Sequence, residues 1–162
     1  MAHEFSGRCL CGAVEYACAS EPMFQANCHC DDCRRSGGGV YASFVFVSEN
    51  MLTVNSGELH SFSHETDRGN TATKYFCPKC GSQLFTRNSA NSGRRGIRVG
   101  TITDASWFQP RANVYAGRRL PSTPIDDEIK AFEEMPDCLG ACSLIQTVTG
   151  GADVRWIVST RC

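Results

Sequence analysis

The chain has 162 residues, 41% of them hydrophobic and 20% charged, and its formal net charge is −1. A chain of this length can form one domain with a real core, and its composition excludes a disordered protein. The near-zero charge gives no electrostatic case for a nucleic-acid partner, and no apolar run reaches the ~20 residues of a membrane helix. Since no signal-peptide pattern is visible at the N-terminus either, we expect a cytoplasmic protein.

Short segments of alternating or β-branched residues, separated by turn residues, follow one another along the chain. Strands are predicted, in chain order, at residues 12–18, 23–27, 40–47, 51–54, 59–62, 73–76, 83–86 and 97–102. Many short strands of this kind predict a mainly β fold. The three glycines at 37–39 either let the backbone approach a ligand or form a flexible loop.

The region after residue 86 combines uneven charge with one short helix. Seven arginines and one acid lie between residues 87 and 119, and six acids and one lysine lie between 120 and 137. The plain interpretation is that these segments neutralise each other, and the alternative is that some arginines bind the carboxylates of a small molecule. A helix is predicted near residues 126–135, because Ile129 and Phe132 are three positions apart and acids occupy its first turn.

Eleven cysteines are far more than an ordinary chain of this length contains. Seven of them form three motifs: C-x-C at Cys9 and Cys11, C-x-C-x-x-C at Cys28, Cys30 and Cys33, and C-P-x-C-G at Cys77 and Cys80. A disulfide framework is the competing interpretation, but such frameworks belong mainly to secreted chains and the cysteine count is odd. Closely spaced cysteines let two sulfurs on one turn approach the same ion, so the spacing predicts metal binding.

The seven cysteines divide most simply into a set of four and a set of three. Cys77 and Cys80 need a second pair, and Cys9 with Cys11 is the other isolated pair. A closed site of four thiolates that joins distant segments is predicted to be structural, because its metal would contribute folding free energy.

The remaining three cysteines, Cys28, Cys30 and Cys33, leave a fourth coordination position open. Three protein ligands and one vacancy are typical of catalytic zinc sites. His29 could supply a fourth ligand, but in an extended segment it would point away from its neighbours, so a surface histidine is the favoured interpretation.

The motifs resemble those of the glutathione-dependent formaldehyde-activating enzyme family, which also includes centromere protein V. The matching segments read GRCLCGAV from Gly7, CHCxxCR from Cys28 and FCxxCGSxL from Phe76. The resemblance covers about residues 7–136, a zinc-binding domain, and leaves 137–162 as a C-terminal extension. It implies a β-tent fold, two zinc ions per chain (one structural, one of catalytic type), and the addition of glutathione to formaldehyde by a carbon–sulfur lyase.

At the triplet, zinc is expected to polarise an aldehyde oxygen or to hold the incoming thiol. Three thiolates around one Zn²⁺ carry a formal negative charge, which weakens the Lewis acid and favours the second role. Arg34 follows the triplet directly and is the candidate for an anionic group of the substrate. The alternative for Arg34 is a surface ion pair with Asp31 or Asp32.

Two other classes of function stay open at this point. One is a related thiol-handling enzyme that acts on another glutathione adduct, and the other is a zinc-stapled binding module without catalysis. The partners expected for the enzyme are a small thiol such as glutathione and an aldehyde. The three cysteines of the C-terminal extension are predicted to be free thiols: Cys138, Cys142 and Cys162.

Overall fold

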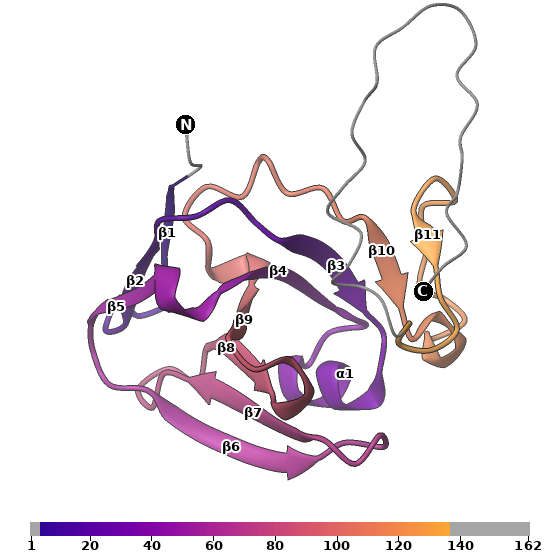
Figure 1. The fold of residues 1–162 in the computed structure, drawn as a ribbon, viewed down its shortest axis with the longest axis horizontal. Coiled ribbons are helices and arrows are strands. Elements are labelled where there is room, and N and C mark those ends of the chain that lie inside the picture. Colours follow the sequence, from indigo (N-terminus) through magenta and orange to yellow (C-terminus); the bar gives the residue numbers. More distant parts are fainter. Residues whose placement is uncertain (1–3, 137–162) are drawn as a thin grey trace, which may run out of the picture.

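The computed structural model describes residues 4–136, which form a mainly β fold of two sheets (Figure 1). The strands are β1 (Phe5–Arg8), β2 (Glu15–Cys18), β3 (Phe24–Cys28), β4 (Ala42–Ser48), β5 (Leu52–Ser56), β6 (His60–Glu65), β7 (Thr71–Phe76), β8 (Gln83–Asn88), β9 (Arg94–Arg98), β10 (Ala112–Val114) and β11 (Lys130–Ala131). The helical elements are α1 (Asp31–Gly37) and four 3-10 turns: η1 (Glu49–Met51), η2 (Ser89–Asn91), η3 (Val99–Thr101) and η4 (Ala116–Arg118).

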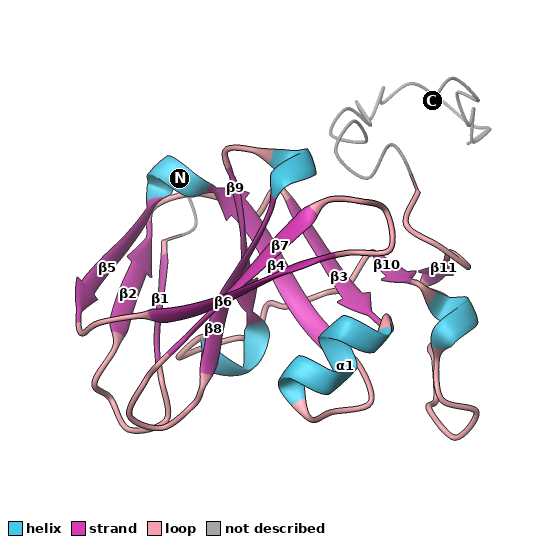
Figure 2. Cartoon of the chain, turned by 90° about the horizontal axis from the view of Figure 1, so that it is seen from below, coloured by secondary structure: helices cyan, strands magenta, loops and turns pink. Residues whose placement is uncertain are grey.

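The two sheets differ in size and in strand direction. A three-stranded antiparallel sheet has the order β1-β2-β5, and an eight-stranded sheet has the order β11-β10-β3-β4-β9-β8-β7-β6. Most of the larger sheet is antiparallel, but β10 pairs in parallel with β3 and with β11. Figure 2 shows the small sheet at one end of the molecule and β10 and β11 at the other, with α1 beside β3 and β4.

Strand β4 separates the two parts of the core. Its Val45 and Val47 face the larger cluster of buried residues, which the small sheet covers. Ala42 and Phe44 face the other way, into a smaller cluster that includes two cysteines of the triplet. Because successive side chains point to opposite faces, one buried strand supplies both clusters. No helix within residues 4–136 has the length and apolar composition needed to cross a membrane.

The mainly β prediction is confirmed, and each of the predicted strands overlaps an observed one. The predicted helix near 126–135 is wrong, because the chain there forms a turn followed by β11. The backbone N–H of Phe132 donates to the carbonyl of Asn113 at 2.8 Å, and that of Ala116 donates to the carbonyl of Phe132 at 2.8 Å. The free edge of β10 thus provides hydrogen-bond partners for the backbone of this segment, and these bonds are more favourable than those of an isolated short helix.

The one α-helix of the described residues, α1, was not predicted. It begins after Cys30, whose sulfur accepts the backbone N–H of Cys33, and it has acids in its first turn. Gly38 ends it with φ of 69°, a left-handed conformation that favours glycine. The glycine run at 37–39 therefore contains the last residue of the helix, Gly37, and its cap, Gly38.

Candidate metal centres

Two turns of similar design bring four thiols together from distant parts of the chain. One turn links β1 to β2 and the other links β7 to β8. In the first, the backbone N–H of Gly12 donates to the carbonyl of Cys9 at 3.1 Å, and in the second Gly81 donates to Cys77 at 2.9 Å. Both glycines have positive φ, 74° and 73°. The glycine after each cysteine pair therefore lets the chain turn tightly enough for both sulfurs to face one point.

The sulfur positions of this four-cysteine set fit a tetrahedral metal ion. The Sγ atoms of Cys9 and Cys11 are 3.5 Å apart and those of Cys11 and Cys77 are 3.8 Å apart, and all four, including Cys80, lie within 4.8 Å of one another. A Zn–S bond of about 2.3 Å places the sulfurs of a tetrahedron about 3.8 Å apart. The predicted closed set of four is thus present as a cluster that could hold zinc.

Hydrogen bonds to two of these sulfurs, those of Cys9 and Cys80, favour the thiolate form that a metal requires. The backbone N–H of Val14 lies 3.2 Å from Cys9 Sγ, and Ser82 Oγ lies 3.2 Å from Cys80 Sγ. The Ser82 hydroxyl lowers the pKa of Cys80 to about 5, because a donor to the sulfur stabilises its negative charge. Ser82 Oγ also accepts the backbone N–H of Leu10 at 3.1 Å, so one side chain ties both turns together.

The three remaining motif cysteines, the triplet, converge at the start of α1. Cys28 is the last residue of β3, Cys30 caps the helix and Cys33 lies in its first turn. Their Sγ atoms lie within 4.8 Å of one another, with 3.4 Å between Cys28 and Cys30. Within residues 4–136, no further His, Cys, Asp or Glu joins this group. Soft thiolate donors at these separations fit zinc, and three of them leave one position for an outside ligand.

Burial of the triplet is uneven. The residue exposures are 7% for Cys28 and 8% for Cys33, while Cys30 is half-buried. Aromatic and apolar side chains cover the rest of the cluster, among them Phe44 and Tyr115. An outside ligand would therefore reach the thiols from the side of Cys30, through a largely apolar surround.

Two cationic side chains that the sequence analysis did not identify, Lys74 and Arg98, lie near the triplet. The Nζ atom of Lys74, on β7, lies 3.8 Å from Cys33 Sγ, and the guanidinium of Arg98, on β9, lies 4.6 Å from the centre of the Phe44 ring. Hydrogen bonds from Cys28 and Cys30, together with these two positive charges, hold the pKa of Cys33 well below its ordinary value. The charge on the triplet is thus balanced partly by the protein itself.

His29 is not the surface residue that its position in the motif predicted. It is 1% exposed, and its Nε2 lies 3.2 Å from Asn113 Oδ1 on β10. Alternation along β3 carries this side chain to the face opposite Cys28, where the parallel strand β10 supplies the amide. The histidine is therefore held away from the triplet and contributes an anchor for the loop that carries it.

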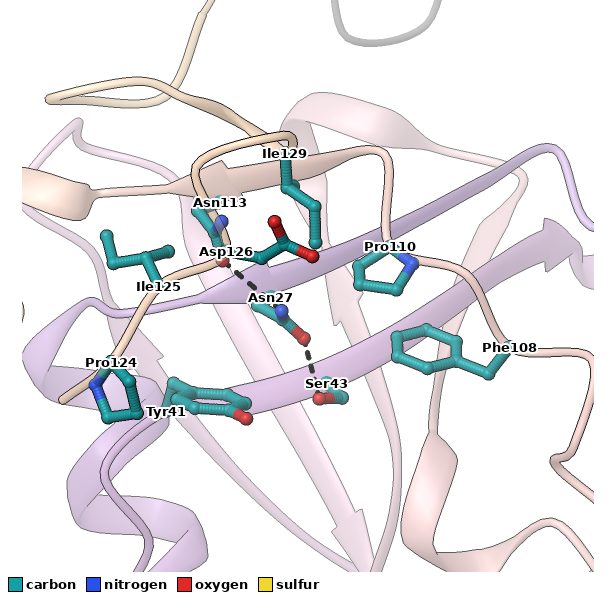
Figure 3. A pocket seen from close by; sticks show the side chains of 10 residues that line it. All are labelled: Asn27, Tyr41, Ser43, Phe108, Pro110, Asn113, Pro124, Ile125, Asp126 and Ile129. Carbon is teal, nitrogen blue, oxygen red and sulfur yellow. Dashed lines mark hydrogen bonds between the residues drawn. The ribbon is translucent and has the colours of Figure 1, made fainter.

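A cavity of about 250 Å³ lies on this opposite face of the sheet (Figure 3). A row of polar side chains crosses its floor: Ser43 Oγ donates to Asn27 Oδ1 at 2.7 Å, and Asn27 Nδ2 donates to Asn113 Oδ1 at 3.2 Å. Around the row stand apolar residues, including Tyr41 and Phe108. Asn27 and its neighbour Cys28 point to opposite faces, so this cavity is separate from the triplet.

Arg34 lies in α1 and forms the ion pair with Asp31 that was the alternative expectation. This pair lowers the pKa of Asp31, because the guanidinium donates a hydrogen bond to the carboxylate. Asp32 instead lies 3.1 Å from His64 Nε2 on β6. The Nε atom of Arg34 is buried and has no hydrogen-bond partner. One donor of Arg34 is thus committed and another is unpartnered.

The two oppositely charged segments neutralise each other only in part. Arg118 contacts Glu134 at 3.7 Å and also pairs with Asp67, which belongs to neither segment. Arg95 pairs with Glu49, which precedes both segments. Partners from elsewhere in the fold, which the sequence could not identify, take up much of the arginine charge.

All eight cysteines between residues 4 and 136 are free thiols in the structure, so none of them forms the disulfides of the competing interpretation. Cys18 is the one of these eight that belongs to neither cluster. The predictions for Cys138, Cys142 and Cys162 concern positions outside the described residues.

Comparison with known proteins agrees with this geometry. A crystal structure of a Rhodobacter sphaeroides protein, determined by structural genomics, matches with a TM-score of 0.50 and 27% sequence identity, over 60% of this chain and 87% of that one. No curated protein matches the chain significantly. The sequence model described as glutathione-dependent formaldehyde-activating enzyme matches residues 4–118. That match spans most of the chain and both cysteine clusters, and the protein therefore belongs to the glutathione-dependent formaldehyde-activating enzyme family.

Proposed function

We propose that the protein is a carbon–sulfur lyase-type enzyme that adds glutathione, or a similar thiol, to formaldehyde or a related aldehyde. The observation that carries this proposal is the contrast in ligand number between the two clusters. Four thiols complete a tetrahedron and leave no place for a substrate, whereas three thiols leave one position. We assign a structural zinc to the four-cysteine set and a catalytic zinc to Cys28, Cys30 and Cys33.

The reaction needs no oxidant or reductant. The S–H bond of the thiol breaks and the sulfur forms a bond to the carbonyl carbon. The C=O double bond becomes a single bond, and a proton equivalent to the one lost by the thiol is bound by the oxygen, which gives a hydroxyl. Zinc held by the triplet would supply a positive charge that lowers the pKa of an incoming thiol. Water can carry the proton, because formaldehyde is electrophilic enough to need no strong general acid.

The chain's own residues contribute binding and exclusion of water. The apolar surround of the triplet, which includes Phe44, Tyr115 and Phe132, limits the access of water to the buried sulfurs of Cys28 and Cys33. Arg34 remains our candidate for binding a carboxylate of glutathione, since the residue follows Cys33 directly and its buried Nε donor has no hydrogen-bond partner. The ion pair with Asp31 orients the guanidinium, and a substrate carboxylate would share it.

Metal analysis and calorimetry test this proposal together. Purified protein should contain two zinc ions, and glutathione at millimolar concentration should bind with measurable heat. Loss of formaldehyde should then be faster than in a protein-free control, which is essential because the two reagents combine spontaneously. Two zinc ions with neither binding nor rate above the control would contradict the enzyme and favour a zinc-stapled binding module. Binding without formaldehyde turnover would favour a related thiol-handling enzyme.

A further inference from the structure

Lys74 occupies a buried position of strand β7, where the alternation of buried and exposed side chains predicts an apolar residue. Along β7 the buried positions are Ala72 and Lys74, alternating with more exposed neighbours. Lys74 is only 5% exposed, although lysine is among the residues least often buried without a partner. A buried ammonium costs several kcal/mol of desolvation unless an opposite charge compensates it.

The compensating charge is a thiolate of the triplet. The partner that the structure gives to Lys74 Nζ is Cys33 Sγ at 3.8 Å, and within residues 4–136 no carboxylate forms an ion pair with it. The contact joins β7 to α1 and is buried, whereas Cys30 is half-buried. Lys74 thus contacts the triplet at Cys33, one of its two buried sulfurs.

Arg98 adds a second positive charge that neighbouring groups do not cancel. Its Nη2 donates to Ser36 Oγ at 3.1 Å and to Gln83 Oε1 at 2.5 Å, and both of these acceptors are neutral. A Cβ at Gly37 would lie 3.3 Å from Arg98 Nη1, so the absence of a side chain there gives the guanidinium room. Among residues 4–136 no carboxylate forms an ion pair with Arg98, so its charge is not cancelled by a neighbouring acid.

We propose that Lys74, assisted by Arg98, is a positioning residue that lets the triplet centre accept an anionic fourth ligand. The inference rests on the proposed function in assuming that the triplet holds a divalent metal. Three thiolates around Zn²⁺ have a formal charge of −1, and an incoming thiolate would make it −2. The two cations bring the complete group to formal neutrality, which removes the electrostatic penalty of placing a second negative charge in an apolar surround.

Anion binding to the cobalt-loaded protein tests this without any enzymatic assay. Co²⁺ in place of Zn²⁺ gives visible absorption bands that respond to the fourth ligand, and thiocyanate serves as a small anionic probe. Lys74→Met and Lys74→Gln should bind thiocyanate about ten- to a hundred-fold more weakly than the native protein. Lys74→Arg, which keeps the charge, should restore most of the affinity. If Lys74→Met fails to fold, Lys74→Gln supplies the same comparison.

Lys79 is the matched control, because it lies beside the four-cysteine set and is exposed to solvent. Lys79→Met removes the same charge in water and should leave thiocyanate affinity unchanged. Equal thiocyanate affinity in native protein and in the neutral Lys74 variants would overturn the inference, as would a native triplet that binds no anion. Thiocyanate binding that depends on Lys74, in a protein that does not consume formaldehyde, would support the inference while contradicting the proposed reaction.

Discussion

The four-cysteine set joins two turns that are far apart in the chain, whereas the triplet lies within residues 28–33. Metal bound at the first closes a long loop, and metal bound at the second closes almost none. Partners of the sulfurs differ as well: backbone N–H groups and a serine hydroxyl surround the first set, and buried cations stand behind the second. The same donor atom thus serves folding in one region and, on our proposal, chemistry in the other.

The largest expected effect comes from breaking the closed centre. Cys77→Ser should abolish soluble folded protein, because a structural zinc contributes about 10–16 kcal/mol of binding free energy, comparable to the total stability of a typical domain, about 5–15 kcal/mol. Circular dichroism and thermal melting measure the outcome. Cys18→Ser is the matched control, since Cys18 is buried outside both clusters and should cost far less. A Cys77→Ser protein that has lost this zinc and still folds cooperatively would show that the centre is not structural.

Breaking the triplet should leave the fold standing. Cys33→Ser should keep a cooperative melt and one zinc ion, and should lose glutathione-dependent activity, because its metal joins residues already close in the chain. Zinc content, melting temperature and formaldehyde loss measure the three parts of this prediction. Collapse of Cys33→Ser to the same degree as Cys77→Ser would mean that both centres are structural.

Acid should separate the two centres by releasing their metals at different pH values. Protons compete with zinc for thiolates, so affinity falls as pH falls at both centres. Within the triplet, the hydrogen bonds between the thiols raise the pKa of Cys28 and lower the pKa of Cys33, so these two shifts oppose each other. The smaller number of ligands at the triplet therefore decides which centre holds zinc more weakly. As the pH is lowered, we therefore expect the triplet to release its zinc first, at a higher pH than the four-cysteine set. A chromophoric zinc indicator follows the release, and simultaneous loss of both ions would contradict the distinction.

Arg34 sharpens the comparison on the substrate side. Arg34→Ala should weaken glutathione binding about ten- to a hundred-fold, since a charge-assisted hydrogen bond contributes about 1.5–3 kcal/mol. Calorimetry at low salt measures the change, and the affinity of the native protein should fall as salt is added. Arg35→Ala is the control. The Arg35 side chain is 78% exposed, and its nearest approach to the Asp31 carboxylate, 3.9 Å, is too long for a hydrogen bond. Equal effects of the two substitutions would remove Arg34 from the proposed site.

The smallest effect is expected at His29, the buried histidine between Cys28 and Cys30 in the sequence. His29→Ala leaves the Asn113 amide without one of its partners, which should cost about 1–3 kcal/mol of stability. Both zinc ions should stay bound, because His29 belongs to neither cluster. Denaturant unfolding and zinc analysis measure these outcomes. Loss of the triplet zinc in a folded His29→Ala protein would show that the histidine takes part in metal binding.

The cysteines of the two clusters could be recognised from sequence as candidate metal ligands, because the spacing of ligands within one motif is a local property. Their division into four and three also followed from spacing, and the structure brings together those same sets. His29 and Lys74 could not be placed in this way, because their environment depends on which strand lies beside β3 and which element covers β7. A signal for Lys74 did exist: it sits among alternating residues of a predicted strand at a position that a buried side chain should occupy.

The segment before Pro136 was assigned wrongly for the converse reason. Its local pattern, with Ile129 and Phe132 three residues apart, fits a helix, but β10 offers a hydrogen-bonding edge that no local pattern reveals. Tertiary pairing therefore decided its structure. The helix that does form, α1, is short and begins at a cysteine, so its start resembled a metal-binding loop more than a helix N-terminus.

The most direct test of the difference between the two centres is anomalous diffraction at the zinc edge from crystals soaked with reduced glutathione. We predict zinc at both cysteine sets, with four protein sulfurs around one ion. Around the other we predict the sulfurs of Cys28, Cys30 and Cys33 together with the sulfur of glutathione. An ion at the triplet whose fourth ligand is a protein group, or a triplet without zinc, would contradict the account.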